Sequence, residues 1–328
     1  MPSLPVHVKA SGFYRALLLR RGRFFETVRR ILIEGRVMKI ATSAYPLDLL
    51  SSWAQYEDKI SSWVAQAAEQ NADLAVFPEY GAMELATLAG ASVAADLEQS
   101  LNAVSERLAD ADALHKKLSI EYGVHILAAS GPAVTSTRPV NRARLFTPQG
   151  GVGVQDKQIM TRFERDPWDV IGGGPLQVFD TSIGRIGILI CYDCEFPLLG
   201  RALAACDILL VPSCTETLAG YWRVRIGAMA RALEMQCVSV MSSVVGTADW
   251  SEAVDVSVGA GGIFAPPDRG FPETGVLSLG ALNAAGWTMA EVDLRHIAKV
   301  RADGIVLGQK HWSEQSGRDD TAPIVDLR

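Results

Sequence analysis

Long hydrophobic runs are missing from this 328-residue sequence. Its longest apolar runs, at 186–191 and 207–212, are far shorter than the roughly 20 residues that a membrane-spanning helix needs. Hydrophobic residues nevertheless make up 48% of the chain, which is ample for the core of a soluble globular protein. We therefore expect a globular protein with no transmembrane segment and no membrane partner.

Cysteine is scarce and odd in number. The five cysteines lie in or beside apolar segments, at positions 191, 194, 206, 214 and 237. An odd number of cysteines in such places does not suit a disulfide framework. The composition therefore favours a reducing, cytoplasmic compartment.

Positive charge is sparse over most of the chain, whose net charge is −6. Proteins that follow a phosphate backbone carry a basic patch, and the main body has none, so we expect no nucleic-acid partner. The first 36 residues differ, because eight basic residues there stand against two acidic ones. This segment is either a transit peptide, a peripheral helical extension or an over-long start before Met38. We predict a basic extension at 1–37 outside the core, one folded domain at 38–305 and a C-terminal tail at 306–328.

Strand-like and helix-like segments alternate from about residue 37. Apolar residues recur every three or four positions within 53–70, which predicts an amphipathic helix. A Pro/Gly turn inside 142–157 predicts a hairpin, and Gly131 and Pro132 are expected to end the strand before them. Other strong patterns predict helices at 97–121 and 221–235 and strands at 37–45, 72–79, 124–130, 184–191, 207–213 and 237–244. Central strands need cover on both faces, so we predict an α/β protein with a mixed sheet and helices outside.

Several catalytic motifs are absent. The sequence has no G-x-S-x-G, and its glycine-rich stretch at 171–175 lacks the lysine and hydroxyl of a phosphate-binding loop. Cys191 and Cys194 form a C-x-x-C, but a zinc site needs a second ligand pair at suitable spacing and none exists. Thioredoxin-like chemistry is also disfavoured, because the intervening Asp193 adds negative charge beside a thiolate. We expect no metal and no organic cofactor.

Reactive side chains instead follow three predicted strands, where pockets form in α/β sheets. Glu79 comes after Pro78, either as an ordinary loop glutamate or as a desolvated carboxylate suited to proton transfer. Lys157 ends a hairpin strand, either as a solvated turn charge or as a fixed cation that stabilises an oxyanion and lowers a thiol pKa. Cys191 ends an apolar strand, either as a buried core cysteine or as a thiolate nucleophile.

Glu79, Lys157 and Cys191, in this order, resemble the catalytic residues of the nitrilase superfamily of carbon–nitrogen hydrolases. The segments similar to that family are DLAVFPEY, QDKQIMTRFERDPW, GRIGILICYDCEFP, RVRIGAMARALEMQCVSVMSS and GGIFAP. The resemblance extends from about Met38 to about residue 302. It implies a four-layer α-β-β-α sandwich of mixed sheets in a single domain, assembled as a homodimer or a higher homo-oligomer.

The resemblance also implies a role for each matched residue. Cys191 is the expected nucleophile, Glu79 the general base and then acid, and Lys157 the oxyanion stabiliser. Glu164 resembles the family's second glutamate, which positions the substrate or the catalytic lysine. An amide is a poor electrophile with a poor leaving group, so its cleavage needs a nucleophile, a proton for nitrogen and a charge that stabilises the oxyanion. These side chains supply all three.

Five further residues complete the prediction. The backbone N–H of Tyr192 is the expected second oxyanion donor, and Ser213 and Thr215, after the strand at 207–213, are expected to line the substrate pocket. Arg231 and Glu234 lie one helical turn apart and resemble the family's structural pair.

The residues around Cys191 bear on the substrate. CYDCEFP differs from the CWE type of true nitrilases, which favours amides or carbamoyl groups over nitriles. No arginine directly follows CYD, where some carbamoyl-hydrolysing relatives bind a substrate carboxylate, so a neutral or small aliphatic amide is favoured. Leu198 replaces a glutamate that many relatives carry. We predict a thiol hydrolase that turns an amide into a carboxylic acid and ammonia through a Cys191 thioester. The alternatives are an N-carbamoyl amino acid or amine hydrolase, a nitrilase, and a non-catalytic binding relative.

Overall fold

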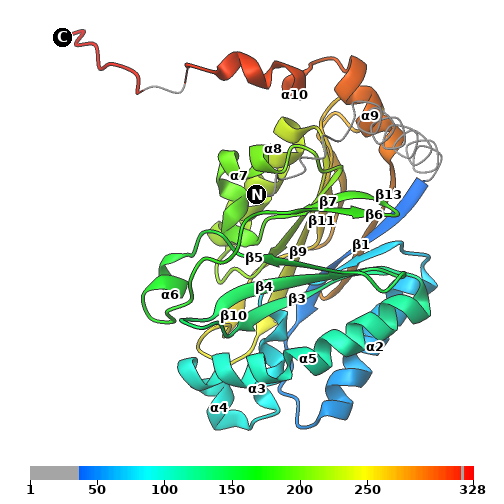
Figure 1. The fold of residues 1–328 in the computed structure, drawn as a ribbon, viewed down its shortest axis with the longest axis vertical. Helices are drawn as coiled ribbons and strands as arrows, with labels where there is room; N and C mark the ends of the chain where they lie inside the picture. Colours follow the sequence, from blue (N-terminus) through cyan, green and yellow to red (C-terminus); the bar gives the residue numbers. More distant parts are fainter. Residues whose placement is uncertain (1–36, 319–320) are drawn as a thin grey trace, which may run out of the picture.

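The computed structural model describes residues 37–318 and 321–328 (Figure 1). The predicted extension at 1–37 therefore lies, except for Val37, outside the described residues. The strands are β1 Val37–Pro46, β2 Leu74–Val76, β3 His125–Ala133, β4 Val140–Phe146, β5 Val152–Asp156, β6 Val178–Thr181, β7 Gly184–Ile188, β8 Ile208–Ser213, β9 Val238–Thr247, β10 Val256–Ser257, β11 Gly262–Phe264, β12 Val276–Leu279 and β13 Gly286–Asp293.

The α-helices are α2 Trp53–Glu69, α3 Glu84–Thr87, α4 Ala91–Ala95, α5 Leu97–Tyr122, α6 Arg162–Arg165, α7 Pro197–Ala202, α8 Leu218–Met235, α9 Leu294–Asp303 and α10 Gly308–His311. The 3-10 helices are η1 Gly81–Met83, η2 Cys191–Glu195 and η3 Trp312–Gln315. Among these helices, none is long and apolar enough to span a bilayer.

The strands form two halves that meet at one seam. Their hydrogen-bonded order is β5-β4-β3-β2-β1-β9-β8-β7-β6, and β13 runs antiparallel to β1. The seam between β1 and β9 is short, because only Ala44–Pro46 pair with 243–245. The two halves can therefore diverge from this seam and face each other instead of lying flat.

Two hydrophobic clusters define the layers. One lies between the β1–β5 half and helices α2 and α5, and it includes Tyr45 and Phe77. The other joins side chains of both halves, such as Ile40 and Ile188, to the apolar side of α8. Helices therefore cover both outer sides of the strands, with α2 and α5 on one side and α7 and α8 on the other (Figure 1). The predicted α/β, four-layer α-β-β-α architecture is confirmed.

One predicted strand end is wrong. β3 continues through Gly131 and Pro132 to Ala133, with a register irregularity between Ala128 and Gly131. The irregularity lets the strand accommodate a proline, which has no N–H for the ladder. As a result Pro132 lies opposite Asn141 of β4.

The first part of the C-terminal segment packs against the folded domain. Gln309 of α10 bonds to Gln236 at 3.1 Å and to the carbonyl of Ala204 at 2.7 Å. Residues 321–328 lie away from the domain (Figure 1). Part of the predicted tail at 306–328 is thus bonded to the residues that follow α8 and α7.

Close packing of α8 on η2 depends on Gly227. A Cβ at that position would lie 2.6 Å from Sγ of Cys194 and 3.0 Å from its carbonyl oxygen. Alanine gains about 1 kcal/mol of helix propensity over glycine, but overpacking costs about 1–3 kcal/mol. The backbone of Cys194 is among the atoms that would have to move. We predict that Gly227→Ala lowers the free energy of unfolding, measured by urea denaturation.

The matched control is Gly308→Ala, where the nearest atom to the new Cβ is 3.9 Å away. This variant should unfold like the unsubstituted protein. A Gly227→Ala protein as stable as this control would contradict the close packing of α8 on η2.

Candidate active site

A cavity of about 440 Å³ opens where β2, β5, β7 and β8 end. Its walls include the predicted residues Glu79, Lys157, Glu164 and Cys191. Glu79 follows β2, Lys157 directly follows β5, and Cys191 begins η2 after β7. The fold thus brings together side chains that lie more than one hundred residues apart.

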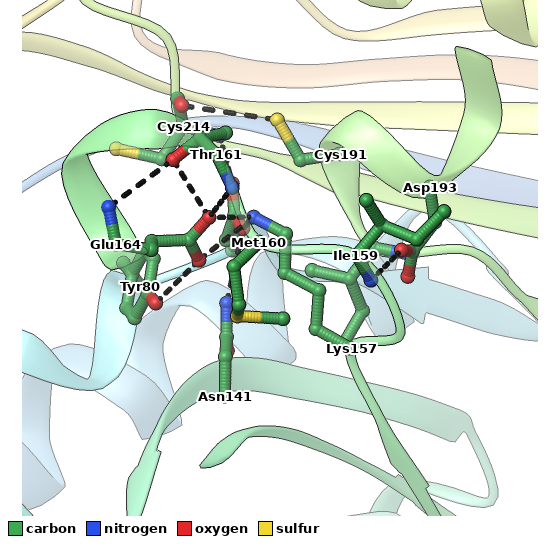
Figure 2. A network of polar contacts seen from close by, with 12 residues as sticks. Tyr80, Asn141, Lys157, Ile159, Met160, Thr161, Glu164, Cys191, Asp193 and Cys214 are labelled. Carbon is green, nitrogen blue, oxygen red and sulfur yellow. Dashed lines mark hydrogen bonds and ion pairs between the residues drawn. The ribbon is translucent and has the colours of Figure 1, made fainter. Parts of the chain in front are cut away.

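A buried ion cluster forms the floor of this cavity. Nζ of Lys157 lies 2.7 Å from Oε1 of Glu79 and 2.8 and 2.7 Å from the two carboxylate oxygens of Glu164. The exposed fractions of Lys157, Glu79 and Glu164 are 1%, 1% and 3%. Figure 2 shows the lysine reaching Glu164, with the hydroxyl of Tyr80 also donating to that glutamate at 2.7 Å.

A local capping motif sets the register of Glu164. Thr161 is the N-cap of α6, and its backbone N–H and hydroxyl both donate to Oε2 of Glu164 at 2.8 Å. This capping box holds the carboxylate of the third helical residue back toward the start of the helix. Glu164 therefore faces Lys157 and not solvent.

The turn that carries Cys191 is fixed by a buried carboxylate. Cys191 has a left-handed backbone with φ of +50°, which few non-glycine residues adopt. Asp193 accepts the backbone N–H of Ile159 at 2.8 Å (Figure 2) and that of Ile190 at 3.2 Å. Asp193 thus joins the Cys191 turn to the segment after Lys157. The Asp193 carboxylate, whose charge disfavours redox chemistry at Cys191, therefore stabilises this turn.

Burial and neighbouring charges set the protonation of the two reactive groups. Burial raises the pKa of Glu79 to about 7, although Lys157 opposes the shift. Burial and then the Glu79 carboxylate raise the pKa of Cys191 well above its usual value. Lys157 lowers the thiol pKa, as the sequence analysis expects, but the other two effects are stronger. Cys191 therefore rests as a thiol beside a carboxyl group that can take its proton near neutral pH.

The lysine stays charged within the same cluster. Burial alone would lower the pKa of Lys157, but Glu164 and Glu79 outweigh burial and raise it above its usual value. Burial likewise opposes ionisation of Glu164, yet Lys157 and the hydrogen bond from Tyr80 lower its pKa. An ammonium and at least one carboxylate are thus preserved at the floor of the cavity.

The remaining predicted residues divide into two groups. Tyr192 and Thr215 line the cavity, but Ser213 does not. The hydroxyl of Ser213 points into the sheet and donates to the carbonyl of Ser242 at 2.7 Å. The prediction that Ser213 lines the pocket is therefore wrong, because the last residue of β8 turns its side chain toward β9.

Cys194 and the predicted structural pair lie behind the cavity. Cys194 is fully buried, with Sγ 3.6 Å from the carbonyl of Val224. Arg231 donates to the carbonyl of Cys194 at 3.0 Å and to Glu234 at 3.0 Å. Arg231, held by Glu234 within α8, thus links this helix to the turn that carries Cys191, which agrees with a structural role for the pair.

Sequence reasoning missed three kinds of contact. Asn141 donates to Glu79 at 3.0 Å, and the backbone N–H of Cys214 donates to the other oxygen of that carboxylate at 3.0 Å. At the rim, Arg223 pairs with Glu195 through two hydrogen bonds. Only Cys214 had a usable signal, because it directly follows an apolar strand.

Within residues 37–318 and 321–328, no three His, Cys, Asp or Glu side chains are grouped to hold a metal ion.

Comparisons with known proteins agree on one family. A family profile described as "Carbon-nitrogen hydrolase" matches residues 39–281. The chain is 32% identical over 276 residues to "Probable hydrolase YhcX" of Bacillus subtilis, covering 82% of this chain and 52% of that protein. It is 32% identical over 146 residues to "Deaminated glutathione amidase" of Yersinia enterocolitica, covering 40% of this chain and 51% of that protein. The chain thus spans about half the length of these curated relatives.

A solved structure gives the same result for the fold. The carbon-nitrogen hydrolase from Helicobacter pylori G27 matches with a TM-score of 0.66 at 17% sequence identity. The match covers 87% of this chain and 96% of that one.

The ion cluster predicts an unusual pH dependence of stability. In Lys157→Met, Glu79 and Glu164 lose their shared cation, so the pKa of Glu79 rises further above its unfolded value and that of Glu164, which Lys157 keeps low, rises as well. A carboxyl group with a raised folded pKa costs no stability below its unfolded pKa. The cost grows as the pH rises and is complete above the folded pKa. We predict a loss of about 3–5 kcal/mol at pH 8, which shrinks as the pH falls toward 5. Urea denaturation at both pH values measures this.

Lys117→Met is the control, because Lys117 is 63% exposed and lies 3.5 Å from Glu57. It should cost under about 1 kcal/mol at either pH. If Lys157→Met lost the same stability at pH 5 and pH 8, the buried carboxylates would not be the source of the effect.

Proposed function

The chain belongs to the carbon-nitrogen hydrolase family of the nitrilase superfamily, and on that premise we propose that it is a thiol amidase that converts a small-molecule amide into a carboxylic acid and ammonia. The observation that carries the proposal is the Lys157 ammonium 2.7 Å from Glu79, in the cavity that Cys191 also lines. The amidase name of one relative gives further support.

The first step forms a bond between Cys191 and the amide carbon. Sγ of Cys191 attacks the carbonyl carbon while its proton passes to Glu79. The carbonyl oxygen becomes an oxyanion, which accepts hydrogen bonds from Nζ of Lys157 and the backbone N–H of Tyr192. Glu164 and Tyr80 keep the lysine charged and in place.

The second step breaks the carbon–nitrogen bond. Glu79 returns its proton to the amide nitrogen, ammonia leaves, and a thioester remains on Cys191. Glu79 then deprotonates a water molecule that attacks the thioester, and the carboxylic acid and the Cys191 thiol are released. A pKa of about 7 suits a group that must act as base and acid in turn.

The rim of the cavity bears on the choice between amides and carbamoyl amino acids. Arg223 is an arginine positioned to meet a substrate carboxylate, but Glu195 neutralises it through two hydrogen bonds. This pairing supports an uncharged amide over an N-carbamoyl amino acid. Product analysis separates the two, because a carbamoyl substrate gives carbon dioxide with ammonia and a simple amide gives ammonia alone. The homo-oligomeric state and the cytoplasmic location stay predictions.

We predict that Cys191→Ala lowers ammonia release by about four orders of magnitude or more, because no other group replaces the nucleophile. Cys194→Ser should retain substantial turnover, since Cys194 lies outside the cavity. The assay is ammonia release over a panel of amides, carbamoyl amino acids and nitriles, with folding checked by circular dichroism. If Cys194→Ser were as inactive as Cys191→Ala, a mechanism that uses both cysteines would replace this one.

A further inference from the structure

Asn141 contacts both Glu79 and Lys157. It lies in β4, fully buried, opposite Pro132 of the neighbouring strand. Its backbone carbonyl accepts the N–H of Lys157 at 2.9 Å. Its side-chain Nδ2 donates to Oε1 of Glu79 at 3.0 Å. Figure 2 shows Asn141 rising from its strand toward the group of polar side chains around Lys157.

The other end of the Asn141 amide is unsatisfied. Oδ1 is buried and has no hydrogen-bond partner among the described residues. A buried acceptor without a partner is costly, so an asparagine kept only to stabilise the fold would be expected to bond at both ends. Rotating the amide would place Oδ1 against Oε1 of Glu79, and two acceptors would then face each other. The orientation is therefore set by donation to Glu79.

The hydrogen bonds divide the two oxygens of Glu79. Oε1 accepts from both Lys157 and Asn141, at 2.7 and 3.0 Å. Oε2 accepts the backbone N–H of Cys214 at 3.0 Å, and the Cys191 thiol donates to the carbonyl of the same Cys214 at 3.9 Å. Oε2 and the Cys191 thiol thus contact the same residue, and Oε2 accepts one hydrogen bond where Oε1 accepts two.

We propose that Asn141 is a positioning residue that holds Oε1 of Glu79 and so commits Oε2 to proton exchange with Cys191 and the leaving nitrogen. The inference rests on the proposed amidase function. Without the Asn141 donor, the carboxyl group can rotate about its terminal bond and present either oxygen, or neither, to the thiol.

The same hydrogen bond affects the ionisation of Glu79. A donor to the carboxylate favours its ionised form, so removal of Asn141 raises the Glu79 pKa. The titratable residues that face Glu79 from other elements include Lys157, Glu164, Cys191 and Cys214. None of them is altered by a change at Asn141. For any reaction that needs ionised Glu79, the acidic limb of the pH–rate profile should therefore move to higher pH.

The test uses Asn141→Ala with Gln155→Ala as the matched control. Gln155 is a buried amide on the adjacent strand that bonds to Asp156 and Gln177 and lies outside the cavity. We expect Asn141→Ala to lower kcat by about ten- to a hundredfold with little change in KM, the scale for losing one hydrogen bond to a charged group. Its kcat/KM profile should move to higher pH, whereas that of Gln155→Ala should not.

A second readout needs no substrate. The rate at which iodoacetamide alkylates Cys191, localised by peptide mass spectrometry, should show the same shift to higher pH in Asn141→Ala. If the unsubstituted protein releases no ammonia from any amide, the proposed function fails, and the alkylation profile still decides the role of Asn141. An Asn141→Ala protein with the unsubstituted pH profile in both assays would overturn the inference.

Asn141→Asp covers the case in which Asn141→Ala does not fold. The aspartate is isosteric but places a second carboxyl group against Glu79, so the acid limb should shift further upward than in Asn141→Ala. An unshifted limb in this variant counts against the inference. If neither variant folds while Gln155→Ala does, Asn141 is a structural residue and the inference is overturned.

Discussion

The ammonium of Lys157, buried between the carboxylates of Glu79 and Glu164, is the interaction on which the site depends. A lysine with only 1% of its surface exposed cannot remain charged without nearby anions, and it lies within 2.8 Å of both. At Glu164 the lysine outweighs burial and lowers the pKa, whereas at Glu79 burial outweighs the lysine and raises the pKa to about 7. The balance of burial against one shared cation therefore gives two chemically similar carboxyl groups different protonation behaviour.

Hydrogen bonds between strand ends hold this arrangement in place. Asp193 ties the Cys191 turn to the backbone after Lys157, and a capping box holds Glu164 against the lysine. The Cys214 N–H after β8 reaches Glu79 after β2. The capping box is local, but the other two links join segments from the two halves of the sandwich, so the site is complete only when both halves are assembled. Close packing of α8 on η2, through Gly227, contributes to this assembly.

The sequence allowed prediction of features that depend on local order. Glu79, Lys157 and Cys191 could be found because each lies at or just beyond the end of a strand that the sequence pattern predicts, and the α/β class follows from the same patterns. Ser213 was misplaced because the direction of a side chain at a strand end depends on its pairing, here with β9. Asn141 could not be found, since its bond to Glu79 crosses 62 residues and its partner on β3, Pro132, lies beyond the predicted end of that strand.

In the proposed mechanism Cys191 carries the acyl group of the substrate during turnover. Rapid acid quenching of the enzyme with its best amide, followed by peptide mass mapping, tests this directly. We expect a mass increase equal to the acyl group, confined to the peptide that contains Cys191 and located on that residue by fragmentation. An acyl group found on Cys214 or Cys194, with Cys191 unmodified, would contradict it.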